Sequence, residues 1–146
     1  MTDLTPQKLA ESCSEAMFSR DQASQQLGMK IISVAPGRAV MTMLVKNHMI
    51  QGHNSCHGGY LFILADSTFA FACNSYDKAT VASGCSIEYV TPAKEGDVLT
   101  ASAEELSRGN RTGVYDITIT NQDGQVVAYF RGKSYQVRGS VRLLEE

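Results

Sequence analysis

The feature that most constrains the fold is one long apolar segment, His57–Asn74, which reads HGGYLFILADSTFAFACN. From Leu61 to Cys73 the only polar residues are Asp66, Ser67 and Thr68. A helix that is apolar on nearly every side must be enclosed by other parts of the chain. The segment therefore predicts a central helix, over about residues 57–75, with the remaining elements wrapped around it.

The other segments predict one more helix and a group of strands. Thr5 and Pro6 are typical of a helix N-cap and first helical position, so we expect an N-terminal helix over about residues 5–27 that stops at Gly28. Two strands flank the turn at Pro36-Gly37, and four more follow the central helix. Strands that are grouped, rather than alternating with helices, predict an α+β fold. A curved antiparallel sheet of about five to six strands would enclose the helix.

The size and charge of the chain indicate how many domains it has and which partners it lacks a reason to bind. Its 146 residues fit a single domain over 1–146, and the net charge of −2 gives no reason to expect nucleic acid or an anionic membrane as partner. No stretch reaches the ~20 apolar residues of a membrane helix. The N-terminal residues do not have the pattern of a signal peptide, so we expect a cytoplasmic protein with reduced cysteines.

Asp66 is the first candidate for chemistry. A single acid in a helix usually lies on a solvated face, and this interpretation stays open. The apolar residues on both sides favour the alternative, an acid in a cleft of low polarity. Desolvation there would raise the pKa of the carboxyl, and such a group is a candidate general base or nucleophile.

The paired glycines Gly58 and Gly59 open the helix. They can serve only as a tight entry into it, but the first N–H groups of a helix also lack intrahelical acceptors and lie at its positive end. Glycine lets a substrate approach that backbone closely. The pair could therefore stabilise a developing oxyanion.

Longer stretches carry a family resemblance. QGHNSCHGGYLFILADSTFAFACN, followed by VASGCSIEYVTPAKEGD, resembles the hotdog-fold acyl-CoA thioesterases, and it looks most like the phenylacetic acid degradation type called PaaI. TGVYDITITNQDG and FRGKSYQV extend the match, which covers about residues 27–137. The resemblance implies the hotdog fold, in which a long central helix is wrapped by the curved sheet.

The resemblance also implies roles for particular residues. Asp66 stands where the family has its catalytic carboxylate, and Gly58 where a backbone N–H polarises the thioester carbonyl. Gln51 stands where relatives have an Asn or Gln that orients the substrate or the attacking water. His57, before the oxyanion glycine, is expected to have a supporting role. Whether Asp66 attacks the carbonyl or activates water stays open.

Two substrate contacts differ from the family pattern. Some relatives have a hydroxyl four residues after the acid, where this chain has Ala70; Ser83 on the following strand is a possible replacement. The turn SRGNRTG offers Arg108 and Arg111 to the phosphates of coenzyme A, although Asn110 interrupts the basic run. The turn is equally typical of a solvated hairpin tip.

The resulting functional prediction is an acyl-CoA thioesterase that converts R–CO–S–CoA and water to an acid and free coenzyme A. The resemblance alone implies an aromatic acyl group, such as phenylacetyl or hydroxyphenylacetyl, and a place in phenylacetate catabolism. No cofactor or metal is expected, because the spacing of His48, His53, Cys56 and His57 fits no standard zinc site. The alternatives are an acyl-CoA hydratase or dehydratase on the same fold, which would need an Asp/His pair in one pocket, and a non-enzymatic acyl-CoA-binding protein.

The geometry of the helix predicts a homodimer at least. Gly58 and Asp66 are eight residues apart, or about 12 Å along one helix, which is too far for both to reach one carbonyl. A second, antiparallel copy of the helix, related by a two-fold axis near Phe62, would bring Gly58 of one chain level with Asp66 of the other. We therefore expect sites shared between chains, and the resemblance implies a further pairing into a homotetramer.

Overall fold

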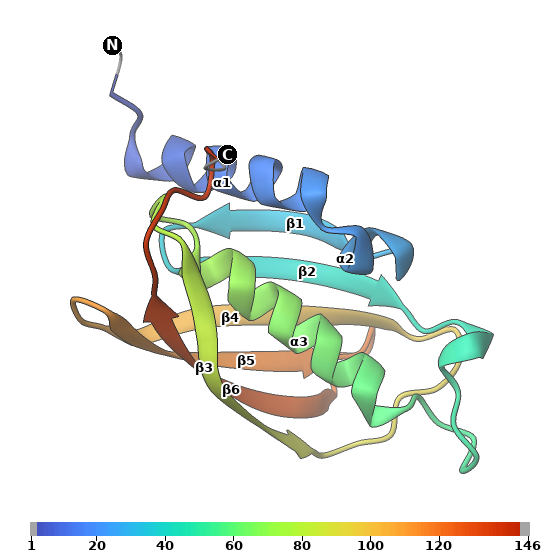
Figure 1. The fold of residues 1–146 in the computed structure, drawn as a ribbon. Helices are drawn as coiled ribbons and strands as arrows, with labels where there is room; N and C mark the ends of the chain where they lie inside the picture. Colours follow the sequence, from blue (N-terminus) through green and yellow to red (C-terminus); the bar gives the residue numbers. More distant parts are fainter. Residues whose placement is uncertain (1–2, 144–146) are drawn as a thin grey trace.

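The computed structural model of the protein describes residues 3–143 and contains one six-stranded sheet with a helix across its concave side (Figure 1). The strand order is β1-β2-β4-β5-β6-β3, and all neighbours are antiparallel. The strands are β1 (Lys30–Ala35), β2 (Arg38–Leu44), β3 (Thr80–Tyr89), β4 (Val98–Arg108), β5 (Thr112–Thr120) and β6 (Val126–Gln136). The predicted α+β class and strand number are confirmed.

The central helix α3 runs over Gly58–Cys73, with His57 as its N-cap and Asn74 as its C-cap. One face packs against the sheet and is buried, with Leu61, Leu64, Ala65, Thr68, Phe69, Phe71, Ala72 and Cys73 as its buried residues. The opposite side, which includes Phe62, Ile63 and Asp66, is only half-buried. Within one chain, therefore, the enclosure of this apolar helix is incomplete.

The N-terminal helix differs from the expectation of one helix over residues 5–27. Thr5 caps α1 (Pro6–Arg20) as predicted, but the chain breaks at Asp21 and continues as the short helix α2 (Gln22–Gln26). The Asp21 carboxylate accepts hydrogen bonds from the backbone N–H of Ser24 at 2.9 Å and from its hydroxyl at 2.6 Å. Because this carboxylate caps a new helix, it ends the first one. A 3₁₀ turn, η1 (Asn47–Met49), precedes the loop to α3.

Strand β5 alternates between its two faces, since Tyr115, Ile117 and Ile119 are buried against α3 while their neighbours lie on the outer face. Strand β3 is different. It pairs with β6 on one side only, so it is an edge strand, and nearly all of its residues are exposed. The exposed fractions of Val81 and Tyr89 are 49% and 56%.

Candidate active site

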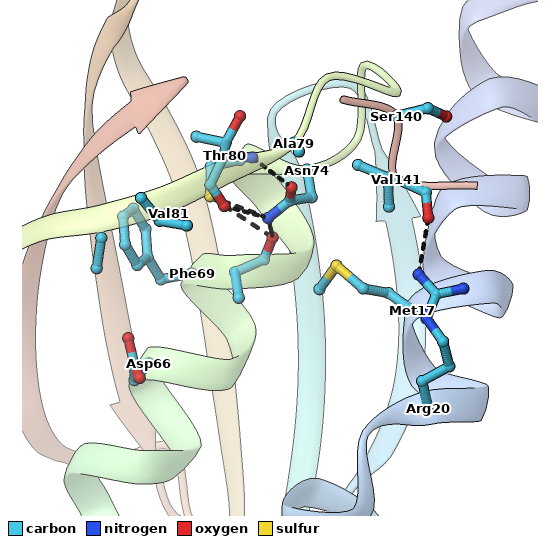
Figure 2. Close-up of a pocket in the computed structure, with 13 residues that line it drawn as sticks. Met17, Arg20, Asp66, Phe69, Asn74, Ala79, Thr80, Val81, Ser140 and Val141 are labelled. Carbon is cyan, nitrogen blue, oxygen red and sulfur yellow. Dashed lines mark hydrogen bonds between the residues drawn. The ribbon is translucent and has the colours of Figure 1, made fainter. Parts of the chain in front are cut away.

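Asp66 lies near the middle of α3, on the half-buried side, in a pocket of about 430 Å³ (Figure 2). Burial raises the pKa of its carboxyl above the usual value of 3.8. Within residues 3–143, no hydrogen-bond donor or cation pairs with this carboxylate. An acid whose charged form is desolvated and unpaired is a poised proton acceptor.

The pocket walls around Asp66 come from several elements. Phe69 and Ala70 belong to α3, and Val81 to β3; most of the wall is apolar. Asn74 fixes the corner between these elements, because its side chain accepts from the Thr80 N–H at 2.9 Å and donates to the Thr80 carbonyl at 3.0 Å. These two hydrogen bonds hold the start of β3 beside the C-terminal end of α3.

The first turn of α3 has a defined hydrogen-bond pattern. The Gly59 N–H donates to His57 Nδ1 at 2.9 Å, so the imidazole caps the helix. In the described part of the chain no acceptor is found for the Gly58 N–H, which leaves that donor available at the positive end of the helix. His57 therefore occupies the N–H of the second helical residue and leaves that of the first, and its supporting role in the reaction stays a prediction.

Gly58 lines a second pocket, of about 350 Å³, together with Gln51 and Leu61. The amide of Gln51 is held within its own loop: it donates to Ser55 Oγ at 2.9 Å and accepts from the His53 N–H at 2.8 Å. The structure therefore brings Gln51 and Gly58 together.

The two pockets do not share a residue. Asp66 is eight residues, or about 12 Å along the helix axis, from Gly58. One chain therefore presents the carboxylate of Asp66 in one pocket and the backbone N–H of Gly58 in the other.

Three further predicted residues lie outside both pockets. Ser83 forms the bulge between Ala82 and Gly84, and its hydroxyl donates to the Lys133 carbonyl at 3.2 Å. Arg108 and Arg111 flank the β4–β5 turn, and the guanidinium of Arg108 lies 3.6 Å from the centre of the Tyr76 ring. Both arginines are exposed.

The cluster of histidines and cysteines does not form a metal site in the described chain. Residues 3–143 contain no group of three His, Cys, Asp or Glu side chains that could hold a metal ion. His48 and His57 instead make edge contacts with the ring of Tyr60. Burial raises the pKa of Cys56 to about 11, so it is held as a thiol. None of the described helices is long and apolar enough to cross a membrane.

Sequence reasoning missed the residues that reach these pockets from distant parts of the chain. Tyr89 covers the Gly58 pocket, and Met17 and Val141 line the Asp66 pocket. Their contacts depend on how α1, β3 and the segment after β6 pack, and no local motif marks them.

Comparison with known proteins shows which family the chain resembles. A family model described as the thioesterase superfamily matches residues 53–128. Over 128 residues the chain is 50% identical to the acyl-coenzyme A thioesterase PaaI of Escherichia coli K12, which covers 88% of this chain and 91% of that protein.

Solved structures give the same result. The E. coli PaaI protein from the phenylacetic acid degradation operon matches with a TM-score of 0.92 at 48% identity, over 93% of this chain and 99% of that one. A thioesterase protein from Streptococcus pneumoniae TIGR4, solved with coenzyme A, matches with a TM-score of 0.73 at 32% identity, over 76% and 90% of the two chains.

The chain therefore belongs to the thioesterase superfamily, and its fold is the hotdog fold. It is an enzyme of the thioesterase class, and within that class it is of the PaaI type.

Proposed function

We propose that this thioesterase hydrolyses acyl-CoA thioesters that carry an aromatic acyl group, such as phenylacetyl-CoA or hydroxyphenylacetyl-CoA, in phenylacetate catabolism. The observation that carries the proposal is the unpaired, half-buried carboxylate of Asp66 in a largely apolar pocket. The E. coli relative is named an acyl-coenzyme A thioesterase and comes from the phenylacetic acid degradation operon, which supports aromatic acyl-CoA as the substrate class. The S. pneumoniae relative was solved with coenzyme A, which supports coenzyme A as the leaving group.

In the proposed reaction Asp66 acts on the thioester carbonyl, either directly or through water. As a general base it takes a proton from water while the water oxygen bonds to the carbonyl carbon. The C–S bond then breaks, its electron pair goes to sulfur, and the thiolate receives the proton from Asp66. As a nucleophile Asp66 would attack the carbonyl carbon and expel the thiolate of coenzyme A, which leaves a mixed anhydride. Water would then open the anhydride to the free acid and the Asp66 carboxylate, and the proton it releases would go to the thiolate. Neither route uses a cofactor.

The N–H of Gly58 would stabilise the oxyanion that develops on the carbonyl oxygen. Gln51 lines the same pocket and would orient the substrate or the attacking water, while the cap formed by His57 would keep the helix start rigid. Gly59 would contribute by letting the substrate approach the backbone closely, since it has no side chain.

Coenzyme A would extend outward from this centre. Arg108 and Arg111 are exposed cations suited to the phosphates of coenzyme A. The stacking of the Arg108 guanidinium on the Tyr76 ring would hold that guanidinium in place. The exposed hydroxyl of Ser83 could accept a hydrogen bond from the substrate as it stands, but could donate one only after releasing the Lys133 carbonyl.

A complete site would need two chains, since one chain keeps Gly58 and Asp66 in separate pockets. The exposed edge of β3 supports such pairing, because an unpaired strand edge with exposed apolar residues such as Val81 is suited to a second strand. We therefore propose a homodimer with two shared sites, and a further pairing into a homotetramer.

The two other functions explain the geometry less well. A hydratase or dehydratase would need a histidine beside the acid, whereas His57 caps the far end of the helix. A non-enzymatic acyl-CoA-binding protein would have no use for an unpaired acid in the acyl pocket.

A thiol-release assay over a panel of aromatic and aliphatic acyl-CoAs tests the proposal. We expect aromatic thioesters to give the highest kcat/KM, and Asp66→Asn to lower kcat for all of them by about 10²–10⁴. Preference for a long aliphatic chain would overturn the proposed substrate class, and absence of hydrolysis would overturn acyl-CoA as substrate.

A further inference from the structure

The Asp66 pocket has a far end that is built by the two terminal segments of the chain. Figure 2 shows Met17 and Arg20 reaching it from α1, and Val141 reaching it from the segment after β6. In Figure 1 this segment runs from the end of β6 up to α1. Val141 is only 5% exposed, so it is a built part of the wall.

One carboxylate holds this segment in place. Oδ1 of Asp77 accepts from the Ser140 hydroxyl at 2.8 Å and from the backbone N–H groups of Val141 and Arg142 at 3.1 and 3.0 Å. Oδ2 accepts from Arg142 Nε at 3.0 Å. Burial alone would raise the pKa of Asp77, but these hydrogen bonds and the charge of Arg142 outweigh it and lower the pKa. We call these contacts of Asp77 the C-terminal latch.

A second contact joins the latched segment to α1. The guanidinium of Arg20 donates to the Val141 carbonyl at 2.7 Å. Both the N–H and the C=O of Val141 are thus fixed, one by Asp77 and the other by Arg20. Because these contacts involve only the backbone of residue 141, its side chain can be substituted without breaking them.

From this arrangement we propose that Val141 and Met17 are specificity-determining residues, which limit how far an acyl group can extend beyond Asp66. The proposal rests on the proposed function, because it takes the Asp66 pocket as the acyl site. The C-terminal latch fixes the position of this end wall of the pocket. The size of the side chain at residue 141 then sets how long an acyl group can fit between Asp66 and the wall. An aromatic ring carried on a short linker fits in front of this wall, and each added methylene presses the ring against it.

The test is a series of acyl-CoAs that differ only in linker length: phenylacetyl-, 3-phenylpropionyl- and 4-phenylbutyryl-CoA. Val141→Ala should raise kcat/KM for the longest member relative to phenylacetyl-CoA by about 10-fold or more, the range for one methylene in an apolar pocket. Val141→Leu should change this ratio in the opposite direction. Val137→Ala is the matched control, since Val137 precedes the latch and does not line the pocket.

Met17 provides a second test at the same wall, in case a Val141 variant does not fold. Met17→Ala removes volume from the opposite element, α1, and should shift the same ratio in the same direction as Val141→Ala. Suppose that Val141→Ala and Met17→Ala fold, that the wild-type enzyme hydrolyses the series, and that neither variant changes the ratio of kcat/KM between the longest thioester and phenylacetyl-CoA. That result would overturn this inference and leave the proposed function standing. A wild-type enzyme that hydrolyses no member of the series would instead overturn the proposed function, and this inference with it.

Discussion

The ring of Tyr89 lies over Gly58, the first residue of α3. Its hydroxyl donates to the Gly58 carbonyl at 3.1 Å, and a Cβ added to Gly58 would lie 2.8 Å from the ring carbon Cζ. Because the Tyr89 side chain is more than half exposed, the ring can move aside at little cost in stability. A side chain at residue 58 therefore disturbs the proposed oxyanion donor before it disturbs the fold.

We expect Gly58→Ala to lower kcat by about 10²–10³, the range for loss of an oxyanion donor, because the added methyl and the displaced phenol block approach to the N–H. The melting temperature should stay close to that of the wild type. Gly52→Ala is the matched control, since nothing lies within 4 Å of its added Cβ. Wild-type turnover by Gly58→Ala would contradict the role of this N–H.

Asp66→Asn should keep the fold and lower kcat by about 10²–10⁴, because the amide neither accepts a proton nor attacks a carbonyl. The same substitution at Asp116 serves as control. That carboxylate is exposed and pairs with Arg131 at 2.7 Å on the outer face of the sheet, where an ion pair contributes little. Steady-state kinetics of both variants should show the loss in Asp66→Asn only.

The raised pKa of Asp66 should appear in two pH profiles. Activity needs the ionised form, so kcat/KM should fall at low pH with a midpoint above 3.8. Between the unfolded and folded pKa values the native chain holds a proton that the unfolded chain has released. The free energy of unfolding therefore falls as pH rises through this window.

Asp66→Asn removes this cost, so its stability advantage over the wild type should grow as pH rises through the same midpoint. Thermal melts of both proteins at several pH values measure it. A constant difference between the two, or an activity midpoint at 3.8 or below, would contradict the assignment.

Mixed dimers test whether two chains share each site. Gly58→Val and Asp66→Asn homodimers should both be inactive. Unfolding and refolding an equal mixture should restore about a quarter of wild-type activity, since half of the dimers are mixed and each of these has one intact site. If mixed dimers form, as shown by mass, and stay inactive, then Gly58 and Asp66 act within one chain.

Gly132→Ala should destabilise the enzyme, because a Cβ there would lie 2.7 Å from the ring of Phe69, which is fully buried in the core. Overpacking of this kind costs about 1–3 kcal/mol in the free energy of unfolding. Gly109→Ala, whose Cβ would have no neighbour closer than 3.7 Å, should melt at nearly the wild-type temperature. Denaturant unfolding of the two variants gives the comparison.

Most of the fold was predictable because its signals are local. Tyr115, Ile117 and Ile119 alternate with more polar residues, as is typical of a strand with one buried face. The central helix is so rich in apolar residues that other elements must cover it. The break at Asp21 was missed, although Asp21 followed by Ser24 is itself a capping pattern. The helix was expected to run on to Gly28 because glycine is the more familiar stop signal.

The site was only partly predictable, for a different reason. Asp66, Gly58 and Gln51 belong to motifs that are contiguous in sequence, so they could be identified together. Tyr89 over Gly58, and Val141 at the end of the Asp66 pocket, result from contacts between distant segments, which depend on the packing of the whole domain. That packing also gave Asn74 its place at the corner of the pocket.

The order of strands has a consequence for how the chain folds as it is made. Strand β3 ends at Tyr89, but its only neighbour in the sheet, β6, begins at Val126, after β4 and β5. During synthesis β3 therefore emerges well before any strand that can pair with it, and its contacts are of long sequence separation, which form late. The strand whose free edge is proposed to join two chains therefore cannot enter the sheet until β6, the last strand of the chain, has been made. The surface for assembly is completed only when nearly the whole domain has been synthesised.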